Sequence, residues 1–199
     1  DEYVREACAP SARADLTSAM IEAMTTHETY FFRDASYWKA FTDLVVPNVL
    51  RAAKARPLRI WSSACSTGQE PYTIAMLLEE TMPEVAARAS ILATDVSEAT
   101  LAFASSGIYG IQEVNRGVTA PRLVRHFDQV GTRFQIKNPL RSRITWECHN
   151  LVNDLYRYRD IDILMCRNVL IYFDEPTRAK VLASLARSLR PGATLGLGA

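Results

Sequence analysis

Two acidic residues stand where the sequence could hold a ligand. Glu70 opens a predicted helix after the apolar run and small-residue turn of RIWSSACSTGQEPY (59–72), and Asp95 ends a second apolar run, SILAT (90–94). In open α/β sheets, an acid at the tip of the second strand can accept hydrogen bonds from ribose hydroxyls. The turn holds one glycine, Gly68, so it lacks the G-x-G-x-x-G pattern of dinucleotide sites. Because a carboxylate here repels a pyrophosphate, a cationic nucleoside ligand fits better than NAD.

Three further polar residues lie beside apolar segments in positions suited to a binding site. Asn168 and Tyr172 follow the apolar run DILMC (162–166), and ligands of parallel sheets bind at the carboxyl ends of strands. Arg33 follows two phenylalanines, where a guanidinium is preorganised to bind a carboxylate. S-adenosylmethionine carries both a sulfonium and an ammonium, so an acid at Glu70 suits this cofactor.

Each of these residues also has an ordinary structural explanation. Asp95 could cap a helix or turn, Glu70 could simply favour the positive end of a helix dipole, and Arg33 could form a surface ion pair. The Ser-Thr-Gly turn upstream favours the ligand-binding role for Asp95. Three histidines lie in separate segments and form no visible triad: His27, His126 and His149.

The composition sets the broad class of protein. The chain has 199 residues and is 48% hydrophobic, so it can form one domain with a buried core. Its net charge is +1. The four cysteines form no C-x-x-C pair, so reduced thiols are expected, with neither a disulfide framework nor a metal site. No apolar run is long enough for a membrane helix, and the N-terminus does not resemble a signal peptide. We therefore expect a cytoplasmic protein that does not insert into membranes.

Strand-like and helix-like segments alternate along the chain and would position the polar residues. The predicted strands cover residues 57–62, 90–94, 162–166 and 193–198. The predicted helices between them cover residues 71–82, 97–107 and 174–189. Such alternation predicts an α/β fold with a mostly parallel sheet and helices on both faces. Two alternating runs, RFQIK and RITWEC, predict further strands between residues 131 and 150.

A basic stretch runs from Arg116 to Arg143, with seven Lys or Arg residues and one acid, Asp128. It could be an ordinary solvated face, or it could be a docking patch for an acidic partner surface. Because it lacks the stacking aromatics of a nucleic-acid platform, we expect no nucleic-acid partner.

Four long motifs occur in the order in which they are found in one family. They are TTHETYFFRD (25–34), WSSACSTGQEPYTIAM (61–76), ATDVSEATLAFASSGIYG (93–110) and CRNVLIYFDEPT (166–177). Through them the chain resembles the CheR-type chemotaxis methyltransferases over nearly all of residues 25–199. Members of this family use S-adenosylmethionine to methylate glutamate side chains of bacterial chemoreceptors.

The resemblance implies a class I, Rossmann-like methyltransferase fold with a small β-subdomain inserted. Residues 1–26 would be the end of an N-terminal helical domain and a linker. Residues 27–199 would be the catalytic domain, with the inserted subdomain at about 128–148. The last strands of the family's sheet would lie beyond the C-terminal end, so we expect a fragment of a longer protein.

The resemblance also implies roles for individual residues. Arg33 and Tyr172 would be catalytic, with Arg33 near the methyl-transfer site and Tyr172 facing the substrate. Asp95 would hold the ribose of the cofactor. The residues implied to contact S-adenosylmethionine are His27, Thr29, Arg33, Glu70, Asp95, Asn150, Leu151, Asn168 and Val169.

Two features bear on the substrate and partners. His27 stands where the family usually has asparagine. Some members use the β-subdomain to hold a receptor's tether peptide, and the short link Gln129–Thr132 predicts a tether-independent enzyme. The expected partners are cytoplasmic chemoreceptor helices, and the expected product is S-adenosylhomocysteine. A related methyltransferase with another substrate, or a non-catalytic S-adenosylmethionine sensor, remains an alternative.

Overall fold

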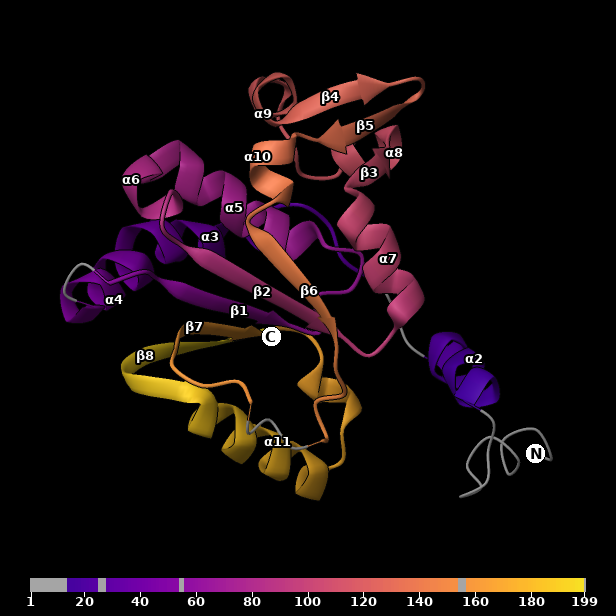
Figure 1. The fold of residues 1–199 in the computed structure, drawn as a ribbon, viewed down its shortest axis with the longest axis vertical. Helices are drawn as coiled ribbons and strands as arrows, with labels where there is room; N and C mark the ends of the chain where they lie inside the picture. The colour runs from indigo at the N-terminus through magenta and orange to yellow at the C-terminus, as the bar shows by residue number, and fades with distance from the viewer. Residues whose placement is uncertain (1–13, 25–27, 54–55, 154–156, 199) are drawn as a thin grey trace.

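The computed structural model describes residues 14–24, 28–53, 56–153 and 157–198, whose strands form two sheets (Figure 1). The larger sheet has five strands in the order β6-β2-β1-β7-β8, and every neighbouring pair is parallel. Its strands are β1 (Arg59–Ser63), β2 (Ser90–Asp95), β6 (Ile144–Cys148), β7 (Ile161–Cys166) and β8 (Leu189–Leu197). The predicted α/β fold with a parallel sheet is confirmed.

Helices cover both faces of this sheet. Adjacent residues of β1 point to opposite faces, since Ile60 belongs to one buried apolar cluster and Trp61 to another. The first cluster contains side chains of α4 and α5, and the second contains Val181 and Leu185 of α11. The helices and helical turns around the sheet are α2 (Ala14–Met24), α3 (Ala35–Ala40), η1 (Phe41–Val45), α4 (Val46–Ala53), α5 (Gln69–Thr81), α6 (Pro83–Ala86), α7 (Glu98–Ser106), η2 (Leu170–Tyr172) and α11 (Glu175–Ser188).

The helix boundaries follow from local capping. The Ser97 side chain accepts a hydrogen bond from the amide of Thr100 at the start of α7, and Gly107 ends this helix in the left-handed conformation. Asp174 caps α11 in the same way through the amide of Thr177. Both boundaries agree with the predictions from the sequence.

A three-stranded antiparallel sheet, in the order β3-β5-β4, stands at one end of the molecule (Figure 1). It consists of β3 (Ile108–Gly110), β4 (Phe127–Val130) and β5 (Arg133–Ile136), accompanied by α8 (Ile111–Asn115), α9 (Ala120–His126) and α10 (Asn138–Arg141). The alternating run that forms β6 pairs instead with β2 of the large sheet. The small sheet therefore spans 108–136 and differs from the range 128–148 expected from the sequence.

No helix in the described ranges combines the length and the apolar character needed to cross a membrane.

Candidate active site at the carboxyl ends of the strands

A cavity of about 370 Å³ opens at the carboxyl ends of β1, β2 and β7. This is where open parallel sheets bind their ligands. His27 lies outside the described residues. The cavity is lined by all the other residues that the sequence analysis assigned to the site: Thr29, Arg33, Glu70, Asp95, Asn150, Leu151, Asn168, Val169 and Tyr172.

The turn between β1 and α5 has an unusual backbone. Ala64, Ser66 and Gly68 all have positive φ, at 55°, 52° and 94°. For a residue with a side chain, the left-handed region costs roughly 1–2 kcal/mol, so the surrounding structure must hold the turn in place. It does so through hydrogen bonds from the amide of Cys65 to the carbonyl of Thr94 (2.9 Å) and from the amide of Gly68 to the carbonyl of Cys65 (3.1 Å). The turn is therefore a fixed wall of the cavity.

Asp95 is held rigidly at the tip of β2. Its carboxylate accepts hydrogen bonds from the amide of Ser66 (2.8 Å) and the amide of Ser97 (3.2 Å). The residue is only 6% exposed, yet it lines the cavity. A carboxylate has about four acceptor positions, so this group can still accept bonds from a pair of ribose hydroxyls.

Glu70 is part of a buried ion pair that the sequence analysis missed. Its carboxylate accepts hydrogen bonds from the Ser62 hydroxyl (2.7 Å) and from the Arg167 guanidinium (3.0 Å). Burial raises the pKa of Glu70, while the Arg167 charge and the Ser62 hydrogen bond oppose that rise. Since Arg167 offsets much of its charge, Glu70 attracts a cationic ligand less than an isolated carboxylate would.

Arg167 connects Glu70 to the segment that carries Arg33. Its guanidinium donates to the Asp34 carboxylate (2.5 Å) and to the Arg33 carbonyl (3.3 Å), and it lies 4.3 Å from the ring centroid of Tyr37. The sequence offered one signal for this role: Arg167 is the only charged residue in the mainly apolar run 165–173, and a buried charge requires partners.

Arg33 lies in a sharp bend at the cavity wall. The residues on either side of it, Phe32 and Asp34, both have positive φ, at 56° and 63°. The Arg33 guanidinium donates one hydrogen bond to the carbonyl of Glu28 (2.8 Å). Because a guanidinium has five N–H donors, the group can bind a carboxylate while it keeps this bond.

The rim of the cavity contains exposed and apolar side chains. Tyr172, in η2, is 61% exposed, so its hydroxyl is accessible at the mouth. Met20 and Met24 of α2 also line the cavity, and the sequence analysis did not assign them to the site. The described part of the chain contains no cluster of three His, Cys, Asp or Glu side chains suited to a metal ion.

Four buried polar atoms on cavity-lining residues have no hydrogen-bond partner among the described residues. They are Trp38 Nε1, Ser66 Oγ, His149 Nε2 and Arg167 Nε. An unsatisfied buried polar group is costly, and a polar nucleoside ligand with an amino-acid tail could satisfy such groups. His149, which the sequence analysis did not assign to the site, also lines the cavity. The residues present therefore fit S-adenosylmethionine.

Comparison with known proteins decides the family. Residues 27–199 match the model of the CheR methyltransferase, SAM binding domain. The chain belongs to the CheR methyltransferase family. It is 37% identical over 192 residues to chemotaxis protein methyltransferase 1 of Pseudomonas aeruginosa, covering 94% of this chain and 70% of that protein.

A second CheR relative is similar to the same extent. The chain is 39% identical over 189 residues to the chemotaxis protein methyltransferase of Vibrio parahaemolyticus, covering 93% of this chain and 68% of that protein. Among solved structures, PKMT2 from Rickettsia typhi is similar with a TM-score of 0.49 and 11% identity, over 85% of this chain and 26% of that chain. The family match and the two chemotaxis methyltransferase relatives show that the protein is a CheR-family methyltransferase that depends on S-adenosylmethionine.

Proposed function

We propose that this enzyme methylates the side-chain carboxylates of glutamate residues in bacterial chemoreceptors, and that it acts on their cytoplasmic helices. One observation supports this most strongly: the lining of a single cavity contains both a fixed acid at a strand tip, Asp95, and an arginine, Arg33. The first is suited to a nucleoside and the second to a carboxylate acceptor. The relatives named above are chemotaxis methyltransferases.

The proposed reaction needs no general base. When bound, S-adenosylmethionine supplies an electrophilic methyl group on a sulfonium. A glutamate side chain has an ordinary pKa of about 4.3, so it is already ionised and nucleophilic at neutral pH. Most of the catalytic effect must come from alignment and from the exclusion of water, which can supply roughly 7–11 kcal/mol in favourable systems.

We assign separate roles to the residues of the cavity. Asp95 binds the ribose hydroxyls, while Asn150 and Leu151 lie beside the adenine. Arg33 orients the acceptor carboxylate, and the exposed hydroxyl of Tyr172 donates a hydrogen bond to it at the mouth. The positions of these side chains in the cavity lining support this division.

The remaining contacts with the cofactor are assigned to Thr29, Glu70, Asn168 and Val169. Asn168 has a φ of 55°, and a Cβ on Gly198 would lie 2.6 Å from its amide nitrogen. The backbone at Asn168 is therefore fixed by close packing, as expected of a residue that must present its side chain to a ligand.

We also propose a division of the chain in which residues 27–199 form the catalytic domain and the small sheet is an insertion in it. The link between β4 and β5 is the two-residue turn Gly131–Thr132. So short a link supports an enzyme that acts without a receptor tether peptide.

The experiment that tests this function is a methyl-transfer assay. The protein is incubated with S-adenosylmethionine labelled in the methyl group and with a chemoreceptor cytoplasmic fragment, with and without its terminal tether sequence. We expect base-labile label that is released as methanol, at equal rates from both fragments. Tight binding of S-adenosylhomocysteine without transfer to any receptor fragment would instead indicate a non-catalytic sensor, and label stable to base would indicate another substrate group.

A further inference from the structure

The segment 28–33, which carries Arg33, is pressed against the backbone of the inserted subdomain. A Cβ atom on Gly117, which follows α8, would lie 1.9 Å from the carbonyl oxygen of Phe31. Gly117 also has a φ of 122°, a conformation that residues with side chains rarely adopt. Any other residue at 117 must therefore displace Phe31, two positions before Arg33.

The Phe31 side chain is anchored in the small sheet. It is fully buried and packs edge-to-face against Tyr109 of β3, with ring centroids 5.0 Å apart, and against Phe127 of β4, at 5.7 Å. Aromatic pairs in this geometry stabilise each other beyond the burial of their surface. The position of the segment therefore depends on the position of the small sheet.

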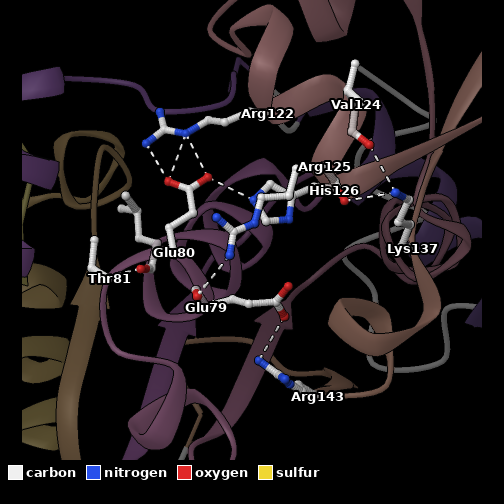
Figure 2. Close-up of polar contacts among 10 residues, drawn as sticks. Glu79, Glu80, Thr81, Arg122, Val124, Arg125, His126, Lys137 and Arg143 are labelled. Atoms are coloured by element: carbon white, nitrogen blue, oxygen red, sulfur yellow. Dashed lines mark hydrogen bonds and ion pairs between the residues drawn. The ribbon is translucent and has the colours of Figure 1, made fainter.

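Arg122 of α9 links the same segment to the large domain. Its guanidinium lies 3.9 Å from the ring centroid of Phe32 and binds the carboxylate of Glu80, in α5, at 3.0, 3.1 and 2.8 Å (Figure 2). His126, also of α9, is buried, and its Nε2 lies 2.8 Å from Oε1 of the same carboxylate. Burial raises the pKa of Glu80, but the bonds with Arg122 and His126 outweigh this and hold its pKa below the ordinary value.

A third contact joins the segment to α8. Arg116 pairs with Glu28 at 2.5 Å, and its guanidinium lies 4.4 Å from the ring centroid of Tyr30. This pair is half exposed and screened by solvent, so it supports the segment less than the buried contacts of Arg122 do.

Most basic side chains of the stretch 116–143 thus contact groups of this chain, although Arg116, Arg125 and Arg133 are exposed. Six of its seven basic side chains bond to groups of this chain: Arg116, Arg122, Arg125, Lys137, Arg141 and Arg143. Figure 2 shows the contacts of Arg122, Arg125, Lys137 and Arg143 around α9 and the end of α5. Neither interpretation of this stretch from the sequence, a solvated face or a docking patch for an acidic partner, anticipated this.

We propose that Arg122 and Gly117 are positioning residues, through which the inserted subdomain holds the segment 28–33, and with it Arg33, against the cavity. Arg122 binds Glu80 near the C-terminal end of α5, and the first turn of the same helix carries Glu70, which lines the cavity. One helix therefore connects the Arg122–Glu80 ion pair to the cavity wall. The role of Arg33 in turnover rests on the proposed function, whereas the anchoring of the segment does not.

The test compares Arg122→Ala and Arg122→Lys with the matched control Arg125→Ala. Arg125 lies on the same helix and is exposed, and it donates a hydrogen bond of 3.4 Å to the Glu79 carbonyl. Amide hydrogen exchange of residues 28–33 is measured without cofactor, kcat is measured in the methyl-transfer assay, and affinity for S-adenosylhomocysteine is measured by calorimetry.

We expect Arg122→Ala to speed exchange in 28–33 by about 10-fold and to lower kcat by about 10- to 100-fold, since a misplacement of about 1 Å can cost this much. Affinity for S-adenosylhomocysteine should fall less than kcat. Arg122→Lys should not restore kcat because lysine lacks the planar fork that binds Glu80. If the alanine variant fails to fold, the lysine variant carries the test, with faster exchange in 28–33 expected.

Several results would overturn the proposal. If residues 28–33 of Arg122→Ala exchanged at wild-type rates, Arg122 would not hold the segment. Faster exchange spread equally over β1, β2 and β7 would show general destabilisation, and faster exchange in 28–33 with unchanged kcat would show that the anchor does not matter for turnover. If the wild-type enzyme transferred no methyl group, the proposed function would fail, while the exchange result would still decide whether the segment is anchored.

Discussion

Replacing Arg167 by methionine should destabilise the fold strongly. Its side chain is 4% exposed and that of Glu70 12%, so the pair that they form is almost fully desolvated. Removing one partner of such a pair typically costs about 3–5 kcal/mol, because the other charge stays buried without compensation. For a domain of this size, we expect Tm to fall by roughly 6–20 °C.

Urea unfolding of four proteins measures this effect: the wild type, Arg167→Met, Glu70→Gln and the double variant. The neutral glutamine no longer needs a cation, so the double variant should recover part of the loss, with a coupling energy of about 0.5–3 kcal/mol. Arg190→Met is a matched control, since Arg190 pairs with Asp160 at 3.4 Å in a more exposed setting and should cost less than about 1 kcal/mol.

The loss of stability in Arg167→Met should depend on pH through the pKa of Glu70. Burial raises the pKa of Glu70, and without Arg167 less opposes that rise. The folded variant then keeps a proton that the unfolded chain releases, so its stability falls as pH rises above the ordinary pKa of a glutamate, about 4.3. The deficit of Arg167→Met should therefore be larger at about pH 7 than at about pH 5. A deficit below about 1 kcal/mol, or strictly additive single changes, would refute the reasoning.

Three further predictions concern the cavity and the base of the sheet. Asp95→Ala should weaken binding of S-adenosylhomocysteine by at least about 100-fold in calorimetry, because two hydrogen bonds to a charged group are lost; unchanged affinity would remove the ribose assignment. Arg33→Ala should lower single-turnover rates far more than affinity for S-adenosylhomocysteine, and equal losses in both would argue against a role in orienting the acceptor. Burial raises the pKa of Asp162, but its bonds with Arg56 and with the amide of Arg59 outweigh this and hold the pKa below the ordinary value. Asp162 therefore adds stability that is lost as pH falls below about 4. The free energy of unfolding of Asp162→Asn should be below that of the wild type at neutral pH, and the difference should shrink below about pH 4. A difference that stays constant with pH would contradict this.

The elements and residues that the sequence revealed best are local. The run 59–63, the turn after it and the acid that follows are neighbours in the chain, and short apolar runs between turn residues define strands without knowledge of the rest of the fold. The cap at Ser97 was predictable for the same reason, because its partner Thr100 is three residues away. Asp95 could be placed at a strand tip as soon as the strand itself was recognised.

The parts that the sequence did not reveal depend on distant partners. β6 has the same alternation as β5, yet it joins β2 of the large sheet, and period-two alternation does not say which sheet a strand enters. Arg167 was passed over although it bonds to Glu70, 97 residues away. The sequence revealed the positive charge of the basic stretch but not the partners of its side chains, since Arg122 and Glu80 are 42 residues apart.

The central claim is that the cavity at the ends of β1, β2 and β7 binds the cofactor beside Arg33, and a crystal structure with S-adenosylhomocysteine tests it most directly. We expect the ribose hydroxyls on the Asp95 carboxylate and the sulfur atom facing the side of the cavity that carries Arg33. A nucleoside bound elsewhere, for example in the second cavity lined by Arg59 and Tyr158, would contradict the account.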